Sequence, residues 1–100
     1  MNQMQQMIMQ AQRMQREMKK AHDALDAKEF VVTKNGMVTV TMLGNRTVKS
    51  IVIDNDAIDP ENADMLSETL AMAINEALES IQKESDAIQE KITGQSGLMF

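Results

Sequence analysis

The chain has 100 residues, the length of a single domain, and its apolar fraction of 43% is ordinary for a folded protein. It contains no cysteine, which excludes disulfides and thiolate metal sites, and no run of about 18 apolar residues that would span a membrane. The net charge of −5 is uneven: residues 1–53 carry eight Lys or Arg and four acids, whereas residues 54–100 carry two and eleven. Such polarity is typical of a protein that presents one face to an anion, although small acidic proteins are often uneven in charge without this purpose.

Residues 1–27 are predicted to form a helical arm, beginning near Asn2, with a narrow apolar stripe. Apolar side chains recur there at intervals of three and four residues: Met4, Met7, Ala11, Met14, Met18, Ala21 and Leu25. This heptad pattern keeps one narrow face of a helix against a partner helix. Because an isolated helix is marginal in water, we expect another helix along this seam, with Met7, Met14 and Met18 in the contact.

The other side of this helix carries a basic stripe, formed by Arg13, Arg16, Lys19 and Lys20. Glu17 is the only acid before His22, and most of the remaining polar positions are glutamines. Glutamine favours helix and hydrogen-bonds to phosphate oxygens or base edges. The pattern therefore favours phosphate contact, although a plain solvated face accounts for it equally well.

Residues 30–53 change to an alternating pattern and predict an antiparallel meander with strands at 30–34, 37–43 and 46–53. Asn35-Gly36 is a strong signal for a type I′ hairpin turn. Gly44-Asn45 suits a second tight turn with glycine at its first central position. Within the middle strand, Val38, Val40 and Met42 share one face, so one side of the sheet is predicted to be apolar.

A second long helix is predicted over residues 60–93, with Gly94 as its stop and a tail at 94–100. The acids of residues 54–59 do not have the spacing of a calcium loop, so we expect a turn and a helix cap there and no metal site. The first part of the helix has a broad apolar face suited to the sheet. Beyond Ile81 only Ile88 and Ile92 keep a narrow stripe, so the helix is expected to project from the core and pair with another helix.

These segments together resemble one known family. They are Met7-Ile8-Met9-Gln10-Ala11-Gln12-Arg13-Met14-Gln15, Gly36-Met37-Val38-Thr39-Val40, Gly44-Asn45, Ile53-Asp54, Asp64-Met65-Leu66 and Ala73-Ile74-Asn75-Glu76-Ala77-Leu78. In this order and spacing, the chain resembles the YbaB/EbfC family of bacterial nucleoid-associated proteins over nearly its whole length. The resemblance implies an α-β-β-β-α protomer, a tweezer-like homodimer with projecting helices, and DNA binding with little sequence stringency.

The sequence therefore predicts one α+β domain, residues 1–100, in which a three-stranded meander is flanked by two long helices. We expect a cytoplasmic protein of the nucleoid that binds double-stranded DNA as a homodimer and alters DNA conformation, nucleoid organisation and gene expression. Phosphate contacts are assigned to Arg13, Arg16, Lys19 and Lys20. No catalytic residue, cofactor, membrane segment or small-molecule substrate is expected, since no nucleophile context or phosphate-binding loop is present.

Two other functions compete with DNA binding. The stronger one is a non-enzymatic adaptor for protein assembly, whose methionine-rich helical arms grip a partner protein, because methionine suits adaptable contact surfaces. A secreted helical hairpin protein of this length is disfavoured by the predicted meander and by the absence of a Trp-x-Gly turn.

Overall fold

The computed structural model describes residues 2–95, and these form two long helices, three strands and two short 3-10 turns. In chain order the elements are α1 (Gln3–Ala27), β1 (Glu29–Lys34), β2 (Val38–Leu43), β3 (Val48–Ile53), η1 (Asn55–Ala57), η2 (Pro60–Asn62) and α2 (Ala63–Gln95). This order confirms the α-β-β-β-α protomer predicted from the sequence. Most of the predicted tail, residues 96–100, lies outside the described residues.

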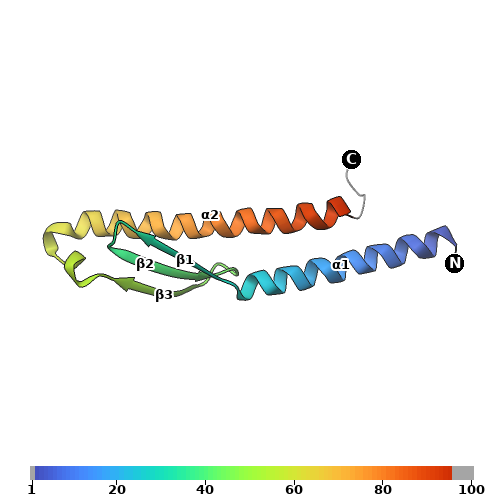
Figure 1. Ribbon diagram of the computed structural model, residues 1–100, viewed down its shortest axis with the longest axis horizontal. Coiled ribbons are helices and arrows are strands. Elements are labelled where there is room, and N and C mark those ends of the chain that lie inside the picture. The colour runs from blue at the N-terminus through green and yellow to red at the C-terminus, as the bar shows by residue number, and fades with distance from the viewer. Residues whose placement is uncertain (1, 96–100) are drawn as a thin grey trace.

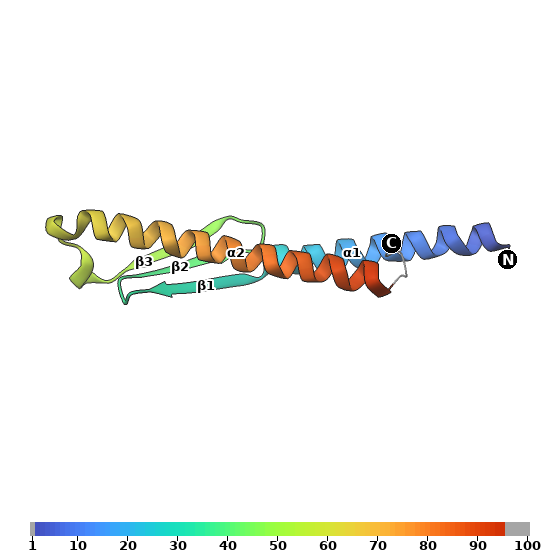
Figure 2. The same ribbon diagram turned by 90° about the horizontal axis from the view of Figure 1, so that it is seen from above.

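The molecule is elongated because both helices extend beyond the sheet. Helix α2 covers one face of the sheet and continues past its end, where α1 runs beside it (Figure 1, Figure 2). The principal extents are 71 × 24 × 14 Å. The radius of gyration is 19.8 Å, well above the ~13 Å of a compact domain of 100 residues. Together, α1 and the end of α2 form an arm that leaves one end of the sheet.

The sheet is an antiparallel meander in the order β1-β2-β3. At the first turn Asn35 and Gly36 have φ angles of 55° and 65°, and the Met37 amide donates to the Lys34 carbonyl at 3.0 Å. These two positive φ angles are those of a type I′ turn, which confirms the hairpin predicted from Asn35-Gly36.

The second turn has the predicted location, but glycine is needed there for space. The Arg46 amide donates to the Leu43 carbonyl at 2.8 Å, and the positive φ angle in this turn, 68°, belongs to Arg46. A Cβ atom on Gly44 would lie 1.7 Å from the carbonyl oxygen of Leu25. The glycine therefore lets the β2–β3 turn pass against the last turn of α1, where its amide donates to the Lys28 carbonyl at 2.9 Å.

The core lies between the sheet and α2. Val38, Val40 and Met42 are buried on the face of β2 that meets the helix, as the alternation predicted. On α2 the buried residues Ala73, Ala77 and Ile81 recur every four positions and form one helical face. The small alanine side chains leave little bulk between the helix and the middle strand.

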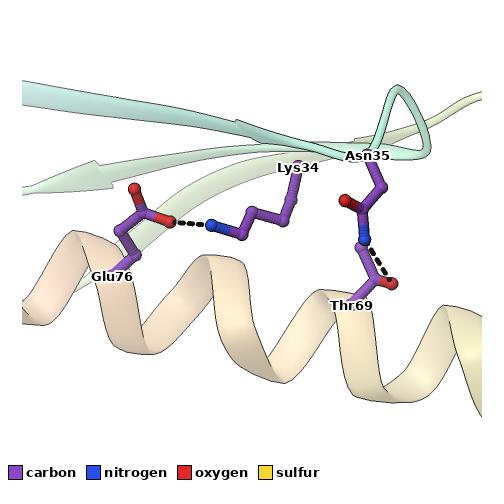
Figure 3. A network of polar contacts seen from close by, with 4 residues as sticks. All are labelled: Lys34, Asn35, Thr69 and Glu76. Carbon is purple, nitrogen blue, oxygen red and sulfur yellow. Dashed lines mark hydrogen bonds and ion pairs between the residues drawn. The ribbon is translucent and has the colours of Figure 1, made fainter.

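Polar contacts fix the first hairpin to α2 at one edge of this core (Figure 3). The ammonium of Lys34 forms an ion pair with Glu76 at 2.7 Å. One residue later, the side-chain amide of Asn35 donates to the hydroxyl of Thr69 at 3.4 Å. Thr69 is buried, so this contact satisfies a polar group that water does not reach.

The regular part of α2 begins and ends later than predicted. Asp59 caps the short turn η2, which includes Pro60, and α-helical geometry starts at Ala63. At the other end, the prediction that Gly94 stops the helix is wrong, because α2 continues through it to Gln95. Glycine in a helix costs only about 1 kcal/mol relative to alanine, so a helix can continue through a single glycine.

Candidate nucleic-acid interface

The basic stripe lies on α1, a helix whose start is fixed by local hydrogen bonds. The Asn2 side chain accepts from the Gln5 amide at 2.8 Å, and the Gln5 side chain accepts from the Asn2 amide at 3.4 Å. This reciprocal capping box explains why the helix begins where it does. Arg13, Arg16, Lys19 and Lys20 are all exposed on this helix.

The four cations of the stripe differ in their partners. Lys19 forms an ion pair with Asp23 at 2.8 Å, and this hydrogen bond and the negative charge raise the pKa of Lys19. For Arg13, Arg16 and Lys20, no hydrogen bond or ion pair occurs within residues 2–95. The spacing of Lys19 and Asp23, four residues apart on a helix, is the sequence signal for this ion pair.

Next to the two arginines the surface of α1 is slightly hollowed. The depression is lined by Gln6, Met9, Gln10, Gln12, Arg13 and Arg16. Apart from Met9, every one of these side chains carries a hydrogen-bond donor. The arginines and the neighbouring glutamines were predicted from the sequence to face phosphates. Met9 was not, although its position outside the heptad seam places it on this face.

The cations between positions 28 and 49, in the strands and beside them, differ from the stripe because each has a hydrogen-bonding partner. Lys28 and Lys34 form ion pairs with Glu84 and Glu76 of α2 at 2.6 Å and 2.7 Å. Arg46 donates to the side chain of Gln82 at 2.8 Å, and Lys49 pairs with Glu29. Residues 30–53 contain no acid, but α2 and Glu29 supply oxygen partners to their cations. The three lysines are therefore neutralised by acids and Arg46 is held by an uncharged amide, whereas Arg13, Arg16 and Lys20 have no partner among residues 2–95.

The seam residues fall into two groups. Met14 and Met18 of α1 are half-buried where α2 lies alongside, and on α2 Ile88 is half-buried and Ile92 is buried. The partner helix expected for this part of the seam is α2 of the same chain. Met7, in contrast, is 65% exposed.

The acidic stretch between β3 and α2 serves as local caps. The carboxylates of Asp54 and Asp59 accept backbone amides of Asp56 and Glu61, each at 2.9 Å. Across the described residues, no group of three or more His, Cys, Asp or Glu is placed to hold a metal ion. Within the same range, neither helix is both long and apolar enough to cross a membrane.

A model of the YbaB/EbfC DNA-binding family matches residues 1–96, nearly the whole chain. The chain belongs to this family. The resemblance found in the sequence is thereby confirmed, and the exposed cations lie on the first helix of a YbaB/EbfC protomer.

Individual relatives agree with this assignment. A nucleoid-associated protein of Enterococcus faecalis is 47% identical over 94 residues, which cover 93% of this chain and 90% of the relative. A nucleoid-associated protein of Chloroflexus aurantiacus is 40% identical over 95 residues, covering 94% of both chains. One of Metamycoplasma arthritidis is 39% identical over 90 residues, covering 90% of this chain and 94% of the relative.

Proposed function

We propose that this YbaB/EbfC protein is a nucleoid-associated protein that binds double-stranded DNA as a homodimer through the basic stripe of α1. It acts without catalytic groups, in the cytoplasm, where the bacterial chromosome lies. By holding the duplex it alters DNA conformation and so affects nucleoid organisation and gene expression. The observation that carries the proposal is the contrast between Arg13, Arg16 and Lys20 of α1, which have no partner among residues 2–95, and the lysines at 28, 34 and 49, which are paired with acids.

The unpaired cations follow one line along the helix. Arg13, Arg16 and Lys20 are three and four residues apart, so they share one face and rise about 10 Å along the axis from first to last. Phosphates on one DNA strand rise about 3.4 Å each, so this line matches a short run of phosphates. Lys19 joins them when a phosphate displaces Asp23, which is exposed and bound to it by a surface ion pair.

Contacts of this kind explain low sequence stringency. Phosphate contacts fix the position of a protein on the duplex without reading its sequence, which is carried by the base edges in the grooves. The stripe consists of long cationic side chains surrounded by glutamines, which donate hydrogen bonds to phosphate oxygens as readily as to bases.

The acidic second helix determines which side of the arm meets DNA. Helix α2 carries seven Asp or Glu and two Lys, so it repels the duplex. Because α1 and α2 lie side by side in the arm, the repulsion favours approach to the outer side of α1. This orientation allows a chain with a net charge of −5 to bind a polyanion.

For the homodimer we propose the edge strand β3 as the contact surface. Helix α2 packs on β1 and β2, and it leaves Val48 and Ile51, on its own side of the sheet, 40% and 41% exposed. An open strand edge beside exposed apolar side chains favours association with a second copy. A two-fold axis at β3 would present two basic stripes to one duplex.

DNA binding is tested by removing unpaired charge and comparing it with paired charge. The double variant Arg13→Gln, Arg16→Gln keeps helix propensity and leaves the seam unchanged. The control Lys34→Gln, Lys49→Gln removes two positive charges from the sheet that are paired with acids. We expect the first variant to lose affinity for two unrelated duplexes, measured by fluorescence anisotropy, and the control to lose much less. Equal losses would mean that net charge alone, and not the stripe, determines binding.

The adaptor function remains a second candidate because apolar side chains are exposed near the start of the arm, including Met4 and Met7. An adaptor would bind DNA weakly at physiological salt, and neither double variant would change that binding.

A further inference from the structure

The first turns of α1 expose an apolar surface that no element of the described protomer covers. Met4 and Met7 are 70% and 65% exposed, and with Gln3, Ile8 and Ala11 they line a shallow apolar depression. This surface lies on the side of the helix opposite Met9 and the arginines. It therefore has no part in the proposed phosphate contacts.

This surface continues an interface that already exists in the molecule. Met14, Met18 and Leu25 lose exposure where α1 packs beside α2. Ala11, Met7 and Met4 extend the same three-and-four spacing toward the N-terminus. This spacing is typical of a helix that packs against a partner helix along its whole length. The N-terminal part of the seam, which α2 does not cover, therefore has the geometry to pack against another helix with the same spacing.

Charge identifies the partner, and the position of α2 identifies its direction. Residues 2–12 contain no charged side chain, so the segment offers nothing to an ionic partner and repels no copy of itself. In a parallel pair, the second copy of α1 would also have to lie along Met14 and Met18, where α2 already packs, so the two copies would clash. In an antiparallel pair centred on Met7, each α1 instead leads away from the α2 of the other copy, and the two Arg13 residues are roughly 18 Å apart along the axis, beyond the screening length of about 8 Å in physiological salt.

We propose that residues 3–11 of α1 pair antiparallel with the same segment of a second copy, at a self-association surface separate from β3. The paired segment is only about two and a half helical turns long. A contact of this length buries far less surface than the ~1,200–2,000 Å² of a stable interface. The pairing is therefore weak, and it links copies that are already dimers or are held close together. It does not depend on DNA binding, so its test contains no DNA.

Because the chain has no cysteine, single cysteine variants report the pairing directly. Met7→Cys places a thiol in the seam, and Met9→Cys is the matched control on the opposite side of the helix, 52% exposed in the parent. Under mild oxidation with copper phenanthroline, we expect Met7→Cys to form disulfide-linked chains on the order of tenfold faster, because pairing raises the effective thiol concentration. Equal rates for the two variants would overturn the proposal.

Direction is tested by mixing two further variants. Met4→Cys mixed with Ala11→Cys should form the mixed disulfide faster than Met4→Cys alone forms its own, since the two positions are within one residue of opposing each other in this antiparallel pair and about 10 Å apart along the axis in a parallel one. Faster linkage of Met4→Cys to itself would contradict this arrangement.

Independence from β3 is tested with the double variant Met4→Gln, Met7→Gln in the otherwise unchanged chain. By sedimentation equilibrium it should remain a dimer and lose the larger species that the parent forms as concentration rises. Dissociation of this variant to monomers would show that residues 3–11 of α1 form the dimer interface itself, and it would overturn the claim of a separate surface.

Discussion

Two glycines in the sheet turns are required for different physical reasons. Gly36 has a positive φ angle and open space around its Cα, whereas Gly44 has no room for a Cβ beside the backbone of Leu25. Alanine at position 36 therefore costs only backbone strain, about 1–2 kcal/mol. Alanine at position 44 meets main-chain atoms that no rotamer change can move.

The first prediction compares these two substitutions. Gly44→Ala should lower the free energy of unfolding by more than about 3 kcal/mol, beyond the usual cost of overpacking, because the obstacle is backbone. Gly36→Ala should cost less. Urea unfolding followed by circular dichroism measures both values, and a larger loss in Gly36→Ala would contradict the packing of the second turn against α1.

The second prediction concerns the one cation of the stripe that has a partner. Asp23→Asn should release Lys19 for phosphate contact, return the pKa of Lys19 toward its ordinary value and strengthen DNA binding. Asp26→Asn, three residues further along the same helix, removes an equal charge and serves as the control. Anisotropy titrations should show a larger gain in affinity for Asp23→Asn, and equal gains would mean that only net charge matters.

At the scale of elements, the pairing of α1 with α2 accounts for half of the seam that the sequence predicted. Heptad spacing showed that a helix must lie along α1, and the narrow stripe at Ile88 and Ile92 showed that α2 needed the same. Neither pattern indicates whether the two stripes pack against each other within one chain or between two chains. The β2–β3 turn packs against the end of α1 at Gly44, and in this arrangement α1 lies beside α2 of the same chain.

The third prediction tests this pairing. Met14→Asp should destabilise the protein by about 1–3 kcal/mol and reduce helical signal, because it puts a charge into a half-buried helix contact. Met9→Asp makes the same change on the exposed side of α1 and should leave the free energy of unfolding nearly unchanged. If both variants melt like the parent, the seam is not a packed contact.

The sheet shows where local signals suffice for prediction. Asn35-Gly36 determines its own turn type, and alternation in β2 predicts which face is buried. Gly94 shows where local signals are not sufficient, because a single glycine can lie inside a long helix or can end one.

At the scale of the whole molecule, ion pairs formed in the fold change which parts of the surface are positive. In the sequence, residues 30–53 contain bases and no acid, so they look like a basic region. Its lysines, however, meet acids that are 42 residues away for Lys34 and 20 for Lys49, a pairing set by sheet register and helix placement. The basic stripe could be predicted because helical spacing is local. The sequence could not show that the lysines at 28, 34 and 49 are paired with acids while Arg13, Arg16 and Lys20 have no partner among residues 2–95.

The fourth prediction concerns assembly. Sedimentation equilibrium at micromolar concentration should give twice the chain mass of 11.2 kDa. Ile51→Asp should yield monomers, because it places a charge in the proposed β3 contact. Val52→Asp, the next residue on the same strand, points to the opposite face of the sheet, is 62% exposed in the parent and should remain dimeric. Dimers of Ile51→Asp would place the interface elsewhere.

The salt dependence of DNA binding tests the proposed function most directly. Each phosphate neutralised by a cation contributes about −0.9 to the slope of log affinity against log salt concentration. The double variant Arg13→Gln, Arg16→Gln removes up to four contacts from a symmetric dimer, so the slope should become roughly 3 to 4 units shallower, nearly equally on unrelated duplexes. A folded double variant with the parent's affinity and salt slope would contradict the assignment of phosphate binding to α1.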